Sequence, residues 1–489
     1  VMADLSLKPL TELFGTKREQ LGHFVSRGGV RLLGALVMAG LLSLNQAWPL
    51  DPWFFVGVTL LSLMAGLMMR AHLASQFPVL EVRRKNERLV WLTCLLGVVG
   101  AQVANLSLSQ DSAYRAAFIL VAPLVAQSML GAALLTPGIA LVALSTSVLL
   151  LGIPGVIPMD VLVGGWLSGA VAAHVVNPLK QRSDLIRALS VQVVAMAGIA
   201  ASMVLVTRET TVPVWEAALW GSVAAIGATA IFWLGVAILE KLFGIVSDWS
   251  LLELCSPEQP LLRELVLHAP GTYAHSVGVG NLAEEAARAI GANPLLCRTM
   301  AYYHDIGKTV RPNYFVENQM SGNLHDDLTP TLSAQIIAAH VDDGVKLARQ
   351  HKLPQIIVDS IEQHHGTTLI SYFYHRAVEQ GVIHLDSVTE ERFRYNGPKP
   401  QKREIAILHL ADIVEAASRV MPSDESTEKF VARLIEGSRA DGQLDESELT
   451  FHDLQVIARS FTRSLAGLRH ERIAYPAQEA AEPPDSLAL

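Results

Sequence analysis

The chain has 489 residues, of which 51% are hydrophobic and only 17% are charged, and its mean hydropathy is +0.34. This composition is too apolar for an ordinary soluble protein of the same length, and it predicts a membrane domain. The formal net charge of -8 argues against a nucleic-acid polymer as a partner, because a surface that follows a phosphate backbone needs an excess of Lys and Arg.

The first half of the chain reads as a membrane protein. Residues 1–28 are expected to form a cytoplasmic N-terminal segment, and residues 29–240 a transmembrane helical domain. Eight apolar segments in this domain have roughly the 17 to 25 residues that cross a hydrocarbon core as a helix. They cover residues 29–48, 52–69, 89–106, 116–134, 137–153, 158–176, 189–206 and 214–239. An even number of spans places both termini on the same side of the lipid bilayer.

The distribution of Lys and Arg predicts which side that is. Basic residues gather before the first span, after the second and after the sixth, whereas the alternate loops carry almost none apart from Arg208. Because short cytoplasmic loops are enriched in Lys and Arg, these three segments should be cytoplasmic. The chain is therefore expected in the cell inner (cytoplasmic) membrane, with both termini and the second half of the chain in the cytoplasm.

Charged residues inside the predicted spans are few. Asp160, His174 and Glu216 lie close to span ends, where their side chains can reach the headgroup region, so no ion pathway is predicted. The small residues Gly164–Gly165 and Gly169–Ala170 are typical of helices that pack closely against a neighbour.

From about Lys241 charges become frequent, and residues 241–475 are expected to form one globular domain. Asn293–Pro294, Thr329–Pro330 and Pro354 are helix-start signals. Period-2 strand patterns are scarce, so this domain, like the whole chain, is predicted to be all-α. Residues 476–489 lack periodicity and are expected to form a disordered tail.

Several histidines and aspartates of this domain lie on the predicted apolar faces of helices, so their side chains should point into the core. His275, His340 and Asp412 each share a stripe with apolar residues at spacings of three, four, seven or eleven, and two His-containing pairs precede glycines at helix ends. Seven side chains are thus directed inward: His275, His304, Asp305, His340, His364, His365 and Asp412. Five imidazoles and two carboxylates without a thiolate suit manganese or iron, and seven ligands are too many for one ion. A pair of metal ions is typical of phosphoester hydrolysis.

These residues follow the ligand order of the HD superfamily, and longer strings around them carry a more specific resemblance. The strings are HAPGTYAHS (268–276), YYHDIGK (302–308), YFVENQ (314–319), EQHHGTTLISYFY (362–374) and RYNGPKPQ (394–401). Together they resemble the seven-transmembrane-receptor HD phosphodiesterases of the PgpH type. The resemblance implies an HD-type phosphohydrolase domain that hydrolyses cyclic di-AMP to linear pApA with two divalent metal ions, Mn²⁺ or Fe²⁺.

The resemblance also implies how the metal ligands divide. One ion would be held by His275, His304, Asp305 and Asp412, and the other by His340, His364, His365 and the same Asp305. Asp305 is then catalytic, and Lys308 is a candidate for both catalysis and substrate binding, because its ammonium can stabilise charge on the phosphate. Arg394 and Lys399 lie in a basic stretch that could bind the second phosphate of a cyclic dinucleotide.

Two departures from the family pattern keep alternatives open. Members of the family usually carry a large extracytoplasmic domain after the first span, whereas here only about Ala47–Asp51 join spans one and two, so an external ligand sensor is not expected. The sequence His365–Gly366–Thr367 replaces the GYP signature of related cyclic di-GMP enzymes. The alternatives are an HD hydrolase of cyclic di-GMP or another nucleotide, and a catalytically silent nucleotide-binding membrane receptor. A homodimer is compatible with each interpretation.

Overall fold

A computed structural model describes residues 32–43, 51–76, 80–107, 113–154, 157–176, 182–208, 212–319, 322–381, 390–422 and 424–468. The predicted cytoplasmic segment 1–28, the connection 44–50 and the predicted tail 476–489 lie outside these residues. The chain divides into two compact units, Val1–Trp249 and Ser250–Leu489.

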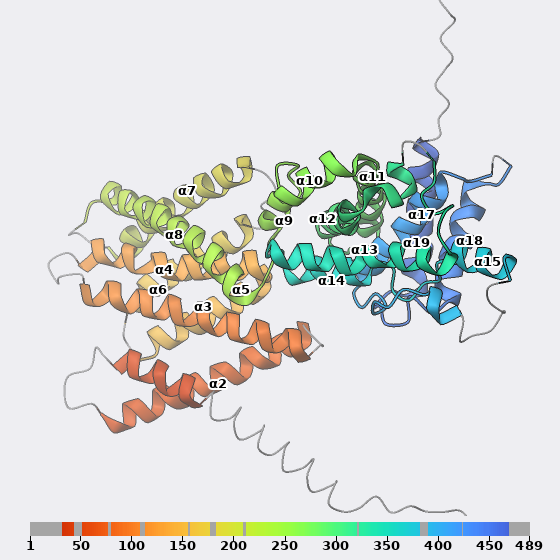
Figure 1. Ribbon diagram of the computed structural model, residues 1–489. Helices are drawn as coiled ribbons and strands as arrows, with labels where there is room; N and C mark the ends of the chain where they lie inside the picture. The colour runs from red at the N-terminus through yellow and green to blue at the C-terminus, as the bar shows by residue number, and fades with distance from the viewer. Residues whose placement is uncertain are drawn as a thin grey trace, which may run out of the picture. The chain divides into compact units, whose positions relative to one another are not determined.

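The first unit is a bundle of apolar helices (Figure 1). A short helix over Leu32–Leu42 precedes the longer ones. These are α2 (Pro52–Gln76), α3 (Leu80–Ser107), α4 (Ala113–Leu134), α5 (Pro137–Gly152), α6 (Met159–Val175), α7 (Arg182–Thr207) and α8 (Val214–Phe243). An apolar helix therefore lies at each of the eight predicted positions.

Helix α4 is the centre of this bundle, since it packs against α3, α5, α6 and α8. Small residues permit the close approach that the sequence predicts. A Cβ atom added at Gly169 of α6 would lie 2.6 Å from a methyl carbon of Leu144 in α5, and the Gly169 carbonyl accepts a 2.7 Å hydrogen bond from Ser128 of α4. The α6 glycine thus joins three helices. Asp160 and His174 lie in the first and last turns of α6, and Glu216 in the first turn of α8.

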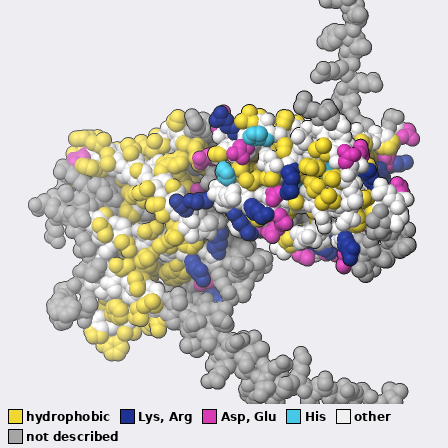
Figure 2. All heavy atoms as spheres, in the orientation of Figure 1, with side chains coloured by type: hydrophobic (Ala, Val, Ile, Leu, Met, Phe, Trp, Pro, Cys, Tyr) yellow, Lys and Arg dark blue, Asp and Glu magenta, His cyan; other side chains and the backbone are white. Residues whose placement is uncertain are grey.

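Length and composition allow four of these helices to cross a membrane: Pro52–Gln76, Lys85–Ala104, Asp184–Thr207 and Val214–Phe243. Three further apolar helices, Leu32–Leu42, Pro137–Gly152 and Met159–Val175, are shorter than the roughly 20 residues of a straight crossing, and α4 counts as an apolar helix only over its part Val121–Leu134. The number of eight spans is therefore not confirmed. Figure 2 shows hydrophobic side chains spread over the surface of the helical bundle, whereas charged side chains are frequent on the second unit.

The second unit is also helical, as predicted. Its helices are α10 (Pro260–His268), α11 (Pro270–Ile290), α12 (Pro294–Tyr303), α13 (Pro330–Gln350), α14 (Gln355–Gln363), α15 (Ser371–Glu379), α17 (Arg403–Ser418), α18 (Thr427–Ala440) and α19 (Phe451–Leu468), after α9 (Asp248–Leu254). Short 3-10 turns connect them: η3 (Ile306–Val310), η4 (Pro312–Tyr314), η5 (Val316–Asn318) and η6 (Glu391–Phe393). Within the described residues of this unit, β structure is limited to one isolated bridge between Leu369 and Arg394.

The predicted helix starts are confirmed. The Asn293 side chain accepts a 3.0 Å hydrogen bond from the Leu296 backbone N–H at the start of α12, and Thr329 caps α13 with Pro330 in its first turn. Both caps satisfy backbone donors that a helix leaves unpaired. Helix α11 packs against α12, α17 and α19, and the buried core between them fixes the elements that carry the inward-facing histidines and aspartates.

One close contact sets the position of the segment after α12. A Cβ atom added at Gly307 in η3 would lie 1.9 Å from the carbonyl oxygen of His340 and 2.5 Å from the backbone nitrogen of Gly344, both in α13. Only glycine permits this approach. Because Asp305 lies two residues before Gly307, the contact brings Asp305 to the His340 turn of α13.

Candidate metal centre

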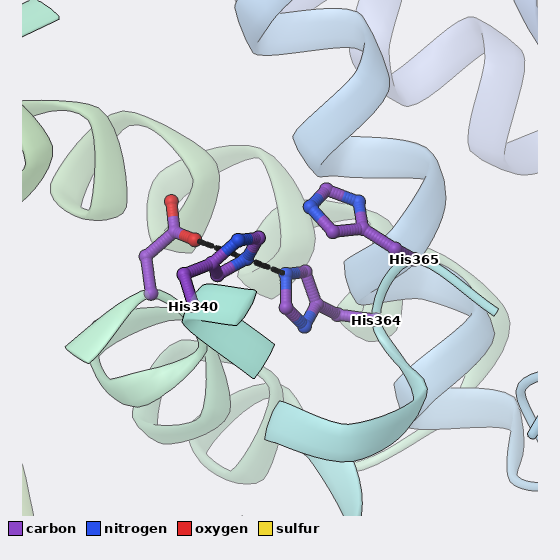
Figure 3. A group of neighbouring side chains, drawn as sticks. His340, His364 and His365 are labelled. Atoms are coloured by element: carbon purple, nitrogen blue, oxygen red, sulfur yellow. Dashed lines mark hydrogen bonds and ion pairs between the residues drawn. The ribbon is translucent and has the colours of Figure 1, made fainter. Parts of the chain in front are cut away.

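The structure brings all seven predicted ligands together from five parts of the second unit. Helices α11, α13 and α17 each supply one residue, and the C-terminal ends of α12 and α14 each supply two. Their ligand atoms form two groups, each with atoms within 4.8 Å of one another: Asp305, His340, His364 and His365 in the first, and His275, His304 and Asp412 in the second. Figure 3 shows the three histidines of the first group, in which Nε2 of His340 lies 3.3 Å from Nε2 of His364.

Asp305 faces both groups with different oxygens. Its Oδ1 lies 3.3 Å from His340 Nε2 and 3.8 Å from His364 Nε2. Its Oδ2 lies 3.2 Å from His304 Nε2 and 3.7 Å from His275 Nε2. A carboxylate placed in this way can bridge two cations, with one oxygen for each. This is the arrangement that the family resemblance implies for Asp305.

Asp412 of α17 also reaches both groups. Its Oδ1 lies 3.0 Å from His275 Nε2 and 3.7 Å from His304 Nε2. Its Oδ2 lies 3.6 Å from Nδ1 of His365. The second carboxylate is thus opposed by three imidazoles, and it supplies the charge that buried cationic groups require.

Backbone carbonyls orient three of the imidazoles. The Nδ1–H groups of His304, His340 and His364 donate to the carbonyls three residues earlier, at 2.7, 2.6 and 2.8 Å respectively. A carbonyl oxygen can only accept, so Nδ1 carries a proton in all three rings, and Nε2 keeps its lone pair wherever the ring is neutral. In all three residues, Nε2 is the nitrogen that faces the carboxylates. Imidazoles held in this tautomer are prepared to bind metal.

His275 is oriented by a carboxylate instead. Its Nδ1 donates to Glu415 Oε2, and Glu415 also accepts a 2.8 Å hydrogen bond from Arg419. Sequence reasoning missed Glu415. The available signal was its position three residues after Asp412, which puts both carboxylates on neighbouring turns of one helix face.

The electrostatics of the two groups differ. Burial alone would lower the pKa of His304, but Asp305 and Asp412 raise it to about 10. Burial and the neighbouring cationic His304 lower the pKa of His364 to about 3, and the pKa values of His340 and His365 are also lowered, mainly by burial. The imidazoles of the first group are therefore neutral at physiological pH, which is the metal-binding form.

The donor set fits divalent metal ions. Nε2 of His304 and Oδ1 of Asp305 are both buried without a hydrogen-bond partner, and leaving such atoms unpaired is costly unless something else binds them. Imidazole and carboxylate donors suit Mn²⁺, Fe²⁺ and similar ions, whereas a structural metal site of the thiolate type would need cysteine ligands. The cluster is thus compatible with a divalent metal centre.

Lys308 lies at the edge of this cluster. Its Nζ donates to Asp305 Oδ2 at 2.8 Å and to Glu317 Oε1 at 2.9 Å. Thr272 holds Glu317 in place through a 3.0 Å hydrogen bond to the same oxygen. Burial would lower the pKa of Lys308, but Asp305 and Glu317 raise it above the usual value for lysine. The ammonium is therefore a fixed positive charge beside the Asp305 carboxylate.

The two other predicted substrate contacts lie in the segment before α17. Arg394 donates through its guanidinium to Glu390, to Asp441 and, at 2.8 Å, to the Thr367 carbonyl. Lys399 Nζ lies 3.5 Å from Asp445 Oδ2. Substrate contact by Arg394 and Lys399 stays a prediction. The hydrogen bond from Arg394 to Thr367 also holds the loop that follows His364–His365.

Two family models match this chain. Residues 52–247 match the family model described as 7TM receptor with intracellular HD hydrolase, and residues 272–417 match the HD domain. The two matches lie one in each half of the chain, the receptor family over residues 52–247 and the HD domain over residues 272–417. The resemblance stated from the sequence is confirmed in both halves.

Curated relatives give the same result. The chain is 52% identical over 240 residues to the cyclic-di-AMP phosphodiesterase PgpH of Bacillus subtilis, covering 48% of this chain and 33% of that protein. It is 45% identical over 261 residues to PgpH of Listeria monocytogenes, covering 52% and 36%. The crystal structure of the L. monocytogenes PgpH HD domain is 44% identical, with a TM-score of 0.41, covering 44% of this chain and 100% of that one. The chain thus spans about a third of the length of the two curated relatives.

Proposed function

We propose that this chain is a membrane-anchored, metal-dependent phosphodiesterase that hydrolyses cyclic di-AMP to pApA. The observation that carries the proposal is Asp305, a buried carboxylate whose two oxygens face two separate groups of metal-competent side chains. A binding module has no need for two adjacent cation sites around one carboxylate, whereas phosphoester hydrolysis uses them. The relatives named cyclic-di-AMP phosphodiesterase support the choice of substrate.

The seven predicted ligands are proposed to hold two metal ions. One ion would be held by His340, His364, His365 and Asp305, and the other by His275, His304, Asp412 and Asp305. When bound, two divalent ions supply activated water and stabilise charge on the entering and leaving oxygens of the phosphate. Nδ1–H hydrogen bonds orient four of the five ligand imidazoles, so little reorganisation of these four is needed when the ions bind.

Lys308 is proposed to bind the scissile phosphate. An ammonium has three N–H donors, and Asp305 and Glu317 use two of them. The third can be donated to a non-bridging phosphate oxygen, where it would stabilise the negative charge that develops during hydrolysis. Arg394 and Lys399 are proposed to act on the second phosphate, with Arg394 limited by its existing ion pairs.

The proposal also covers the position of the chain in the membrane and its assembly. We propose eight spans in the inner membrane, with domain limits at residues 28, 240 and 475 and a cytoplasmic HD unit. The basic loops of the sequence support this orientation. Loading with Mn²⁺ or Fe²⁺ and assembly as a homodimer complete the proposal.

The test is hydrolysis by the full chain in lipid nanodiscs, loaded with Mn²⁺ or Fe²⁺, on cyclic di-AMP, cyclic di-GMP and pApA. Conversion of cyclic di-AMP to pApA that stops on chelation is the expected result. Preference for cyclic di-GMP would transfer the proposal to the alternative substrate. Tight binding of a dinucleotide with two bound metals and no turnover would favour the receptor alternative.

Asp305→Ala gives the sharpest variant for this assay. We expect turnover to fall more than about 100-fold, since even the loss of groups that only support metal ligands costs 10- to 100-fold. The helical content should be unchanged by circular dichroism. Asp326→Ala is the matched control, because the Asp326 side chain is 66% exposed and pairs only with Arg376 among the described residues. Full turnover by a folded, metal-replete Asp305→Ala protein would refute the mechanism.

A further inference from the structure

His365 is held differently from the other four imidazoles of the centre. His304, His340 and His364 are each oriented by a hydrogen bond from Nδ1 to a backbone carbonyl, and His275 is oriented by Glu415. No such bond holds the His365 imidazole among the residues that the structure describes, and its Nδ1 lies 3.6 Å from Asp412 Oδ2. Its side chain is also the most exposed of the five, at 21%.

Aromatic stacking takes the place of the missing hydrogen bond. The ring of Tyr395 stacks on the His365 imidazole with 4.2 Å between ring centroids and 27° between ring planes. The His364 ring lies 4.0 Å from His365 with an interplanar angle of 41°. The orientation of His365 is thus set by contact between ring faces.

The chain around Tyr395 is fastened to the chain around His365. Tyr395 N–H donates to the Thr368 carbonyl at 3.1 Å, and Arg394 donates to the neighbouring Thr367 carbonyl at 2.8 Å. The isolated β-bridge joins Arg394 to Leu369. Because both backbones move together, the Tyr395 ring keeps a fixed position relative to the His365 imidazole.

We propose that Tyr395 is the positioning residue for His365, and that its ring, rather than its hydroxyl, orients this imidazole for the metal ion of the first group. The inference rests on the proposed metal role of His365 and adds to it the device that prepares the ligand. Without the ring, the His365 side chain would sample other rotamers, and binding would have to restrict them. The affinity of one ion should depend on Tyr395, and that of the other should not.

The experiment is titration of the metal-free full chain in nanodiscs with Mn²⁺, in which electron paramagnetic resonance counts the unbound ion. Tyr395→Leu should weaken one of two Mn²⁺ sites roughly 3- to 10-fold, the range set by one aromatic contact, and leave the other unchanged. Tyr395→Phe keeps the ring and should bind like the wild type. Tyr372→Leu is the control, since that side chain is 63% exposed and its ring contacts Phe373 rather than a ligand.

A double-mutant cycle tests whether Tyr395 acts through His365. His365→Ala should weaken the same site, and adding Tyr395→Leu to it should cause no further loss. Additive losses, or equal losses from Tyr395→Phe and Tyr395→Leu, would overturn the assignment. If the wild type binds no Mn²⁺, the proposed function itself fails. If the wild type binds two ions and His365→Ala weakens one while Tyr395→Leu does not, only the role of Tyr395 fails.

Discussion

At the scale of single residues, each predicted ligand depends on the group that orients it. His275 is the only one of the five imidazoles whose Nδ1 proton goes to a carboxylate, that of Glu415. A carboxylate partner increases the basicity of an imidazole and fixes its orientation. Glu415 is itself held by Arg419, so the support for His275 extends through Glu415 of α17 and through Arg419, the residue that follows this helix.

Glu415→Ala should therefore lower Mn²⁺ affinity at the group of His275, His304 and Asp412 by about 10- to 100-fold. Glu415→Gln should cost less, because its amide oxygen can still accept the Nδ1 proton. Titration with Mn²⁺ measures both. Glu436→Ala serves as the control, since the Glu436 side chain is 61% exposed and pairs with Arg439. Unchanged affinity in Glu415→Ala would show that His275 needs no partner.

At the scale of elements, a feature could be predicted from the sequence where it depends on residues close to one another in the chain. Helical periodicity fixed the faces of His275, His340 and Asp412, and the capping residues fixed the helix starts, because both follow from neighbours in sequence. The partners Glu415 and Tyr395 could not be predicted in this way. Each contact joins a ligand to a residue at least 30 positions away, and only the folded chain decides which elements meet.

Gly307 is an element-scale contact that can be tested. Gly307→Ala would place a methyl group against the His340 carbonyl, and relieving this overlap by moving η3 away from α13 should cost about 1–3 kcal/mol. We expect a lower melting temperature of the HD unit in calorimetry, together with weaker metal binding. Gly437→Ala in α18 is the matched control, since nothing lies within 4 Å of its added Cβ. There, replacement of a helical glycine should stabilise slightly.

The stabilisation of the loop after His365 by the contact between Arg394 and Asp441 should depend on pH. Burial would raise the pKa of Asp441, but hydrogen bonds from Arg394 and Gln443 lower it below the usual value. A carboxyl group with a lowered folded pKa stabilises the fold above its unfolded pKa, about 4, and this stabilisation is lost as the pH falls through the folded value. The melting temperature of Asp441→Asn should therefore lie below that of the wild type at pH 6 to 7. The difference should shrink below about pH 4, and a constant difference would refute the ion-pair role.

At the scale of the whole molecule, composition predicted a membrane unit, and the scarcity of strand patterns predicted a helical second unit, but helix length left the number of spans open. Helix α5 has only 16 residues and α6 only 17, although both are strongly apolar. Helices of this length can cross where the bilayer thins or where flanking residues reach the interface. Hydropathy therefore identifies these helices as membrane segments, and only their orientation can show that each one crosses.

Fusions that report the side of the membrane can establish that orientation. With eight spans and a cytoplasmic N-terminus, alkaline phosphatase should be active when fused after residue 110, 155 or 210, and green fluorescent protein should fluoresce after residue 78 or 180. The basic residues at positions 83–88 and 180–187 favour the cytoplasm for the latter two. If α5 and α6 failed to cross, as a pair, the fusion after residue 155 would report the cytoplasm while those after residues 180 and 210 kept their sides. That pattern would give six spans and still place the HD unit in the cytoplasm, where a cyclic dinucleotide would reach its metal centre.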